Sequence, residues 1–307
     1  MTMFKNRCIV IFLLMISFIG YGQQDPQFTM YQYNPLTVNA GYAGSRGHLT
    51  AISLYRSQWA GLEGSPETIT FGIDTPLSIS SGAGLNIIQD ELGPSTETYI
   101  DANYAYQLIL NRKGDKLALG LKAGARVFNL DFSKGIRRDQ DDVQFNENVN
   151  SRLLPTVGAG LFYYTDKAYL GLSVPNFFAS EHFDRQTEVR SLERTHFFLI
   201  GGYVFDVNPT LKFKPSFFVK QVVGAPIQVD VSGNFLLSET LNLGVNYRWD
   251  DSISALLGFK ISPKFDLGYA FDYSTNGLNQ FNSGTHEVFL RYQFVSRDKL
   301  LKSPRFF

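Results

Sequence analysis

The sequence predicts an all-β protein, a transmembrane antiparallel outer-membrane β-barrel of about fourteen strands, with an N-terminal segment packed in or under the barrel. Three observations predict this fold: an N-terminal export signal, apolar and polar residues that alternate with a period of two, and long and short connections that alternate along the chain. The composition agrees, because 27 Phe, 16 Tyr and 27 Gly in 307 residues favour short strands and tight turns over helices.

Residues 1–22 are predicted to be the export signal. Lys5 and Arg7 supply its positive start, a short apolar run follows, and Gly20-Tyr21-Gly22 forms a small-x-small cleavage site. The run is too short for a membrane helix, and Cys8 precedes the run, whereas a lipoprotein cysteine would follow it. The mature chain is therefore expected to begin at Gln23 without a cysteine. Without the two basic residues of the signal, the 28 basic residues of the sequence become 26, against 28 acidic residues. The mature chain therefore has no excess of positive charge, and nucleic acid is not an expected partner.

The alternation of apolar and polar residues defines the expected strands. In "YIDANYAYQLIL", from Tyr99, and in "LNLGVNYRWD", from Leu241, one face is apolar and the other polar. The expected strands span roughly 47–56, 67–76, 81–90, 96–110, 116–127, 154–164, 168–175, 195–205, 210–220, 227–237, 241–250, 252–261, 264–273 and 285–295. A soluble extracellular β-protein also alternates in this way, so the pattern alone does not distinguish it from a membrane barrel.

The connections favour the membrane barrel. Every long one is an odd-numbered junction between strands, and the even-numbered junctions are all short turns. The long connections are residues 57–66, 128–153, 176–194, 221–226 and 274–284. Sequential antiparallel strands place odd and even junctions at opposite ends, as in outer-membrane barrels with short periplasmic turns and longer extracellular loops. Both termini are then expected in the periplasm. The inward faces carry charges of both signs, which fits an occupied lumen better than an ion-selective pore, although a water-filled passage is an alternative.

The motifs that could carry catalysis are weak. The pair His286-Glu287 has Leu290 where a zinc helix would place its second histidine, and Ser283 beside His286 has no identifiable acid partner. The glycine runs at Gly82 and Gly158 lack the third glycine and the helix of a phosphate loop, and are expected to let a neighbouring backbone or lumenal segment come close. No catalytic residue, cofactor or metal site is predicted, and the protein is not expected to be an enzyme.

The stretch "QDPQFTMYQYNPLTVNAGYAG", Gln24 to Gly44, follows the signal and has no strand or helix period. Pro26 and Pro35 would interrupt a strand ladder, and its aromatic residues would be costly to expose. Residues 23–45 are therefore predicted to start on the periplasmic side and to pack into the barrel mouth or lumen as a plug or docking element; a plain N-terminal strand is the alternative. The barrel is assigned to 46–295, and a basic periplasmic tail, a candidate docking segment, to 296–307.

Two blocks, "DPQFTMYQYNPLTVNAGYAGS" from Asp25 and "RSQWAGLEGSPET" from Arg56, resemble the start of the PorP/SprF family of type IX secretion system membrane proteins. Further similar stretches are "NYRWDD" from Asn246, "SGTHEVFLRYQF" from Ser283 and the terminal "SPRFF". The resemblance covers essentially the whole mature chain. The candidate partner-contact or structural signature residues are Asp25, Pro26, Tyr33, Asn34, Pro35, Asn39, Arg56, Gln58, Trp59, His286 and Glu287.

The resemblance implies an outer-membrane component of type IX secretion, often linked to gliding motility, that supports export and surface attachment of cargo such as adhesins. The implied partners are the C-terminal domain of a secreted cargo protein, the translocon or periplasmic components, and outer-membrane lipid. Cargo would be bound and not chemically changed. A channel or porin for small solutes is the alternative function.

Overall fold

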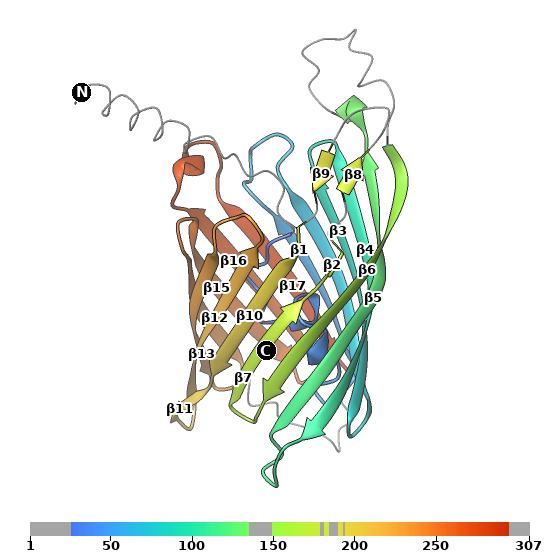
Figure 1. Cartoon of the computed structure of the whole chain (residues 1–307). Helices are drawn as coiled ribbons and strands as arrows, with labels where there is room; N and C mark the ends of the chain where they lie inside the picture. The colour runs from blue at the N-terminus through green and yellow to red at the C-terminus, as the bar shows by residue number, and fades with distance from the viewer. Residues whose placement is uncertain (1–25, 135–148, 179–180, 184–189, 193, 295–307) are drawn as a thin grey trace, which may run out of the picture.

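The computed structural model describes residues 26–134, 149–178, 181–183, 190–192 and 194–294. Fourteen strands close an antiparallel barrel, in which each pairs with its neighbours in sequence, β1 pairs with β17, and β10 pairs with β12 (Figure 1). They are β1 (Thr50–Ser57), β2 (Glu67–Ser78), β3 (Ser81–Leu92), β4 (Ser95–Ile109), β5 (Lys116–Leu130), β6 (Val149–Tyr164), β7 (Ala168–Val174), β10 (His196–Tyr203), β12 (Leu211–Val222), β13 (Gln228–Leu237), β14 (Leu241–Arg248), β15 (Ser252–Ser262), β16 (Phe265–Ser274) and β17 (Thr285–Gln293).

The remaining elements are short. β11 (Phe205–Asn208) continues β10 after a break at Val204, and β8 (Glu181–Phe183) pairs with β9 (Arg190–Leu192) outside the ring. The 3-10 helices are η1 (Pro35–Thr37), η2 (Ala40–Tyr42), η3 (Phe132–Lys134) and η5 (Gly277–Gln280). No helix in the described ranges is long and apolar enough to cross a membrane.

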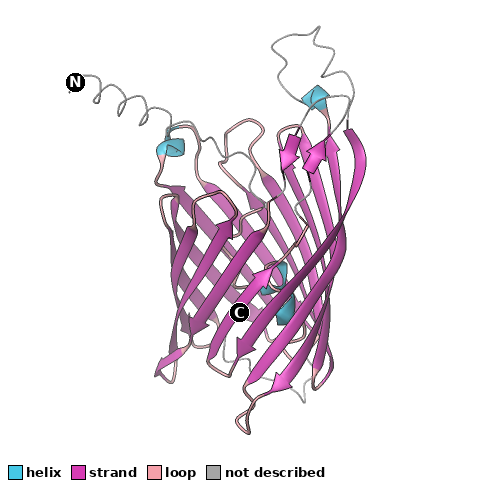
Figure 2. Cartoon of the chain, in the orientation of Figure 1, coloured by secondary structure: helices cyan, strands magenta, loops and turns pink. Residues whose placement is uncertain are grey.

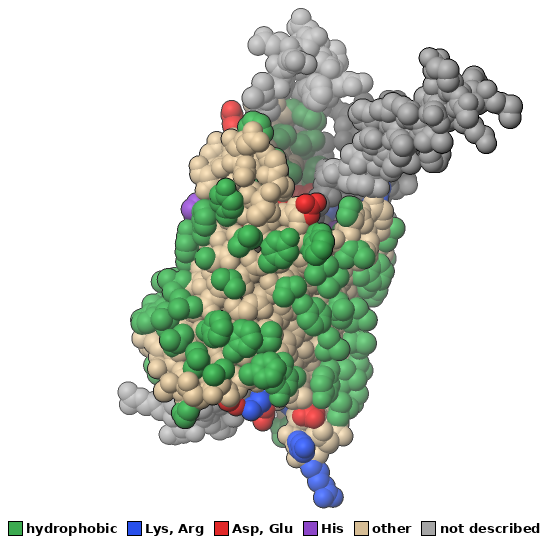
Figure 3. Space-filling view, turned by 90° about the vertical axis from the view of Figure 1, so that its left-hand side faces the viewer, with side chains coloured by type: hydrophobic (Ala, Val, Ile, Leu, Met, Phe, Trp, Pro, Cys, Tyr) green, Lys and Arg blue, Asp and Glu red, His purple; other side chains and the backbone are tan. Residues whose placement is uncertain are grey.

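The predicted alternation of faces is confirmed. In β4, Tyr104 and Tyr106 are 47% and 48% exposed on the outside, whereas Asn103 and Gln107 are each 3% exposed on the inside. Hydrophobic side chains cover the barrel wall in the view of Figure 3, and charged side chains lie near its two ends. An apolar outer band with charged rims is the surface that a lipid bilayer requires of a barrel.

β6 begins at Val149, earlier than the expected start at residue 154. The backbone of Val157 faces away from β5, because its carbonyl accepts a hydrogen bond from the Phe177 N–H at 2.8 Å. Pro155, two residues earlier, faces the same way, and β7 pairs with β6 only from Ala159 onward. On the side of β6 that faces away from β5, no strand pairs with Pro155. The missing N–H of this proline therefore interrupts no ladder hydrogen bond.

The predicted segregation of the connections is also confirmed. The strands that flank every long connection meet it at the same end of the barrel, here called the long-loop end, uppermost in Figure 1. The opposite, short-turn end holds the tight turns, such as the one from Ser262 to Phe265, together with the start of β1 and the end of β17. This arrangement follows from strands that alternate in direction around a closed ring.

An N-terminal segment packs inside the barrel, as predicted. Residues 26–48, here called the plug, lie in the lumen and contain no strand (Figure 2). Pro35 is the first residue of η1, where a missing N–H costs no helical bond. Asn39 caps η2, its side-chain oxygen accepting from the Gly41 N–H at 2.8 Å. Met30 and Ala43 have no exposed surface, so the plug is as buried as a protein core.

The direction of the plug differs from the prediction. Its first described residues lie at the long-loop end, where Gln27 donates to Gln228, the first residue of β13, at 2.9 Å. Its last residues lie at the short-turn end, where His48 is hydrogen-bonded to Gln293 at 3.0 Å. The segment was expected to start beside the short turns, and its first described residues lie at the opposite end of the barrel. The reason is that the plug crosses the whole lumen before it turns back into β1.

Several predictions concern residues outside the described ranges. These are the signal at 1–22, Asp25 and the basic tail at 296–307.

Candidate functional site: the plugged lumen

A buried ionic cluster anchors the plug near the long-loop end. Arg56 of β1 lies 2.8 Å from Glu287 of β17 and 3.0 Å from Asp272 of β16, and all three side chains are at most 4% exposed. Glu287 accepts the backbone N–H groups of Thr29 and Met30 at 2.9 and 2.7 Å. The Thr29 hydroxyl donates to Asp272 at 2.7 Å. The carboxylates thus satisfy both the arginine and the plug backbone, the pairing that buried charges require.

Neutral polar side chains hold the plug farther along the lumen. The Gln32 amide donates to Ser232 of β13 at 2.9 Å, and the Asn39 amide donates to the Leu161 carbonyl of β6 at 3.0 Å. The inward-facing polar residues of the barrel therefore serve as partners for a polypeptide that has no ladder of its own. Two further wall contacts reach the plug backbone: Asn86 to the Leu36 carbonyl at 2.9 Å and Ser173 to the Val38 carbonyl at 2.6 Å.

Aromatic residues on the inner wall pack against plug aromatics. Tyr33 stacks on Phe289 at 4.2 Å between ring centroids, and its hydroxyl is hydrogen-bonded to Asn242. Tyr31 lies 4.9 Å from Phe218. These inward-facing phenylalanines depart from the polar-in pattern because a polypeptide, and not water, covers them.

Glycines on the wall let the plug backbone approach closely. A Cβ on Gly120 would lie 2.1 Å from the Gly41 nitrogen, and one on Gly82 would lie 2.2 Å from the Ala43 carbonyl oxygen. The predicted role of Gly82 as a point of close approach is confirmed. Side chains larger than hydrogen at either position would displace the plug.

At the short-turn end, Arg46 and His48 hold the last residues of the plug in place. Arg46 donates to the Tyr33 carbonyl and to the Tyr42 hydroxyl, each at 2.6 Å. Burial, and then the nearby charge of Arg46, lower the pKa of His48 below its ordinary value. The imidazole is therefore held in its neutral form near neutral pH.

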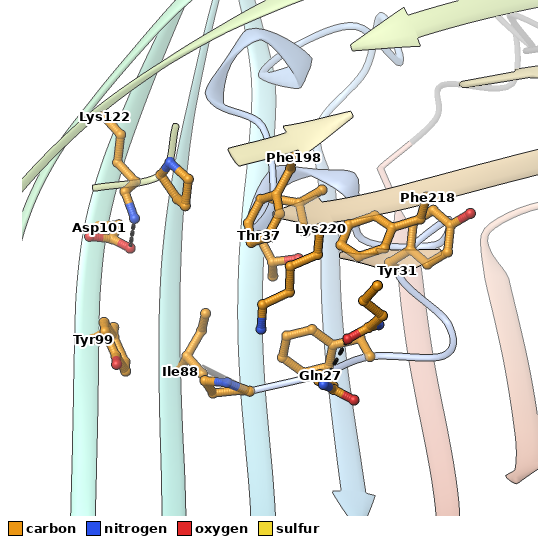
Figure 4. Close-up of a pocket in the computed structure, with 15 residues that line it drawn as sticks. Gln27, Tyr31, Thr37, Ile88, Tyr99, Asp101, Lys122, Phe198, Phe218 and Lys220 are labelled. Carbon is orange, nitrogen blue, oxygen red and sulfur yellow. Dashed lines mark hydrogen bonds and ion pairs between the residues drawn. The ribbon is translucent and has the colours of Figure 1, made fainter. Parts of the chain in front are cut away.

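An open pocket lies beside the plug in the half of the lumen toward the long loops. Phe28 and Tyr31 of the plug and Phe198 and Phe218 of the wall give it an apolar lining. Its polar groups include the Lys122–Asp101 ion pair, at 2.9 Å, and Lys220 (Figure 4). Such a mixture suits a mostly apolar ligand with a few polar groups.

The structure brings together only some of the predicted site residues. Five of the predicted residues lie in the plug, and one of these five also lines the pocket; two anchor the plug from the wall, and two lie in the first long connection. The plug residues are Tyr33, Asn34, Pro35 and Asn39, all buried, and Pro26, which also lines the pocket; the wall residues are Arg56 and Glu287; and the loop residues are Gln58 and Trp59. The backbone N–H of Trp59 donates to the Thr285 hydroxyl at 3.1 Å, which ties this connection to β17.

His286 points away from Glu287 and lies on the outer face, where its ring is hydrogen-bonded to the Tyr269 hydroxyl at 2.7 Å. The two neighbours in "HE" therefore belong to opposite faces of β17, as the period of two requires. No group of three or more His, Cys, Asp or Glu side chains that could hold a metal ion occurs in the described part of the chain. Thr29 and Asp272 complete the anchor but are not in the predicted set, since Thr29 carries no sequence signal of its own.

Fold and site together define a plugged β-barrel of the outer membrane. The family model "Type IX secretion system membrane protein PorP/SprF" matches residues 20–292. The chain therefore belongs to the PorP/SprF family and is an outer-membrane component of the type IX secretion system. A search of curated proteins found no match.

Solved outer-membrane proteins show only a distant likeness. The Acinetobacter baumannii outer membrane protein Omp33 is 9% identical, with a TM-score of 0.45 over 80% of this chain and 98% of that one. The CymD monoaromatic hydrocarbon channel is 11% identical, with a TM-score of 0.48 over 90% and 96%. A Pseudomonas aeruginosa FadL homologue is 11% identical, with a TM-score of 0.45 over 81% and 90%. Likenesses this low carry no information on what this chain binds.

Proposed function

We propose that the protein supports export and surface attachment of a secreted cargo protein by binding the cargo's C-terminal domain, without catalysis. In this proposal the long loops face the cell exterior and the short turns face the periplasm. Family membership supports a role in secretion, and the plug is the observation that favours binding over conduction. A lumen filled by an anchored polypeptide suits a rigid support better than a wide solute passage.

We assign the binding of a cargo segment to the pocket in the half of the lumen toward the long loops. It opens beside the plug, and its aromatic lining would bury apolar side chains of an inserted segment. Cargo that leaves the translocon on the outer side would meet this end of the barrel first.

Affinity purification of the intact protein from cross-linked outer membranes, followed by mass spectrometry, tests the proposal. We expect recovery of a large exported protein with a C-terminal secretion domain. Ile88 lines the pocket, so Ile88→Trp should reduce that recovery several-fold, whereas Ile87→Trp, on the neighbouring outward-facing residue, should leave it unchanged. The channel alternative predicts steady single-channel conductance and no co-purified partner, a result that would overturn the proposal.

A further inference from the structure

We propose that a monovalent metal cation binds on the inner wall of the barrel, between Asn246 of β14, Ser254 of β15 and Asp272 of β16, and helps to hold the plug. The inference does not depend on the proposed function. It rests on the charge balance around the plug anchor, and on buried oxygen atoms in one row of the wall that have no hydrogen-bond partner among the described residues.

The ion pairs around the anchor leave a surplus of negative charge. Arg56 pairs with two buried carboxylates, as described above. Arg248 of β14 lies 2.9 Å from Asp230 of β13 and 3.3 Å from Asp251. In these pairs two arginines face four carboxylates, and of the four only Asp251, with a side chain 32% exposed, is open to water. Because a buried charge without a counter-ion is costly, the surplus favours an additional cation.

One carboxylate oxygen of the cluster has no partner. Asp230, Asp251 and Glu287 each accept hydrogen bonds through both carboxylate oxygens. Asp272 accepts them through Oδ2 alone. Its Oδ1 is buried, and no described residue donates a hydrogen bond to it. A cation at this oxygen would balance charge where the cluster leaves it uncompensated.

Two neutral oxygens lie in the same row of the wall as Asp272. Ser254 is directly opposite Asp272 in the ladder, and Asn246 is directly opposite Ser254. All three residues face inward and are at most 3% exposed. The Ser254 hydroxyl lies near the Asp272 carboxyl without hydrogen-bond geometry, and neither amide atom of Asn246 has a partner in the described structure. Because neighbouring strands are about 5 Å apart, the side chains on either side of Ser254 can reach one ion beside it.

The oxygen atoms of this row fit a monovalent metal cation better than a divalent one. Calcium sites combine roughly six to eight oxygen ligands, several of them from carboxylates. Here one carboxylate oxygen is joined by a hydroxyl and an amide oxygen. The other oxygen of Asp272 accepts from the Thr29 hydroxyl of the plug at 2.7 Å. An ion at Oδ1 would therefore fix the wall residue that holds the first part of the plug.

Unfolding of the purified intact barrel in sodium, potassium and choline chlorides of equal concentration tests the site. Choline is too large to enter the row, so it reports the effect of ionic strength alone. A ligand that binds only the folded state stabilises it by mass action. The unfolding temperature of the wild type in SDS gels should rise by several degrees over a roughly hundredfold increase in sodium or potassium, and not in choline.

Variants of the row separate a bound ion from a general salt effect. Asn246→Leu keeps the volume of the side chain and removes an oxygen ligand, so it should abolish the rise. The matched control is Asn103→Leu on the inner face of β4, also 3% exposed, which should retain the rise. Ser254→Ala is the second test variant if Asn246→Leu lowers the amount of folded barrel. A rise that both Asn246→Leu and Ser254→Ala retain would overturn the site.

A proton is the other cation that would balance the cluster. The wild type would then unfold at the same temperature in all three salts, and this result would overturn the metal assignment. A rise with calcium alone would overturn it as well, because the site would then hold a divalent ion.

Discussion

Replacement of Arg56 by methionine should destabilise the barrel more than removal of every charge in its cluster. Methionine keeps an apolar stem but leaves Asp272 and Glu287 without the cation that lies 3.0 and 2.8 Å away. Their side chains are 4% and 1% exposed, so water does not replace the arginine. Removal of one partner of a buried ion pair costs about 3–5 kcal/mol.

The matched control is the triple variant Arg56→Met, Asp272→Asn, Glu287→Gln, which has no buried charge in the cluster. Removal of every charge in the cluster leaves no unpaired buried ion, which is the source of the large cost of the single variant. The amide that replaces the Glu287 carboxylate can accept the Thr29 or the Met30 N–H through one oxygen only, which leaves about 1–3 kcal/mol of loss for an unpaired plug N–H. The triple variant should therefore be more stable than the single variant.

The assay is the temperature at which the purified barrel converts from its compact to its unfolded form in SDS gels. Each kcal/mol of lost stability lowers the unfolding temperature by a few degrees. The single variant should therefore unfold about 6–20 °C below the wild type, and the triple variant should recover part of that loss. An unchanged unfolding temperature for Arg56→Met, or a triple variant less stable than the single one, would refute the role of the cluster as a charged anchor.

Two further predictions concern the middle and the short-turn end of the plug. Gly120→Ala places a Cβ 2.1 Å from the Gly41 nitrogen and should lower the unfolding temperature by an overpacking cost of about 1–3 kcal/mol, whereas Gly277→Ala, with no atom within 4 Å, should not. Because burial lowers the pKa of His48, the stability linked to its neutral form is complete above the unfolded value of 6.5 and is lost as pH falls below it. The unfolding temperature of wild type should therefore drop more than that of His48→Gln between pH 8 and pH 5, and equal drops would contradict this linkage.

The strands could be predicted from the sequence because lipid outside and polar contacts inside impose the period of two. The loop asymmetry likewise follows from strand order alone. The apolar, proline-containing stretch after the signal predicts a buried segment, since its aromatics would be costly in water. These features depend on local pattern, which a single sequence carries.

The direction and the anchors of the plug could not be predicted in this way. Thr29 and its partner Glu287 are 258 positions apart, and an irregular segment has no period to set a register with the wall. The inward phenylalanines, such as Phe289, are exceptions to the alternation until the plug that covers them is known. Arg56 and Glu287 are in the predicted set, but the resemblance that selects them does not say that they meet.

Single-channel recording tests most directly the central claim that the N-terminal segment closes the lumen. The comparison is between the wild-type barrel and a variant that lacks residues 25–42, each shown to be folded by gel mobility before insertion into a planar bilayer. We expect no steady conductance from the wild type and stable open steps from the deletion variant. Equal, steady conductance from both would contradict it.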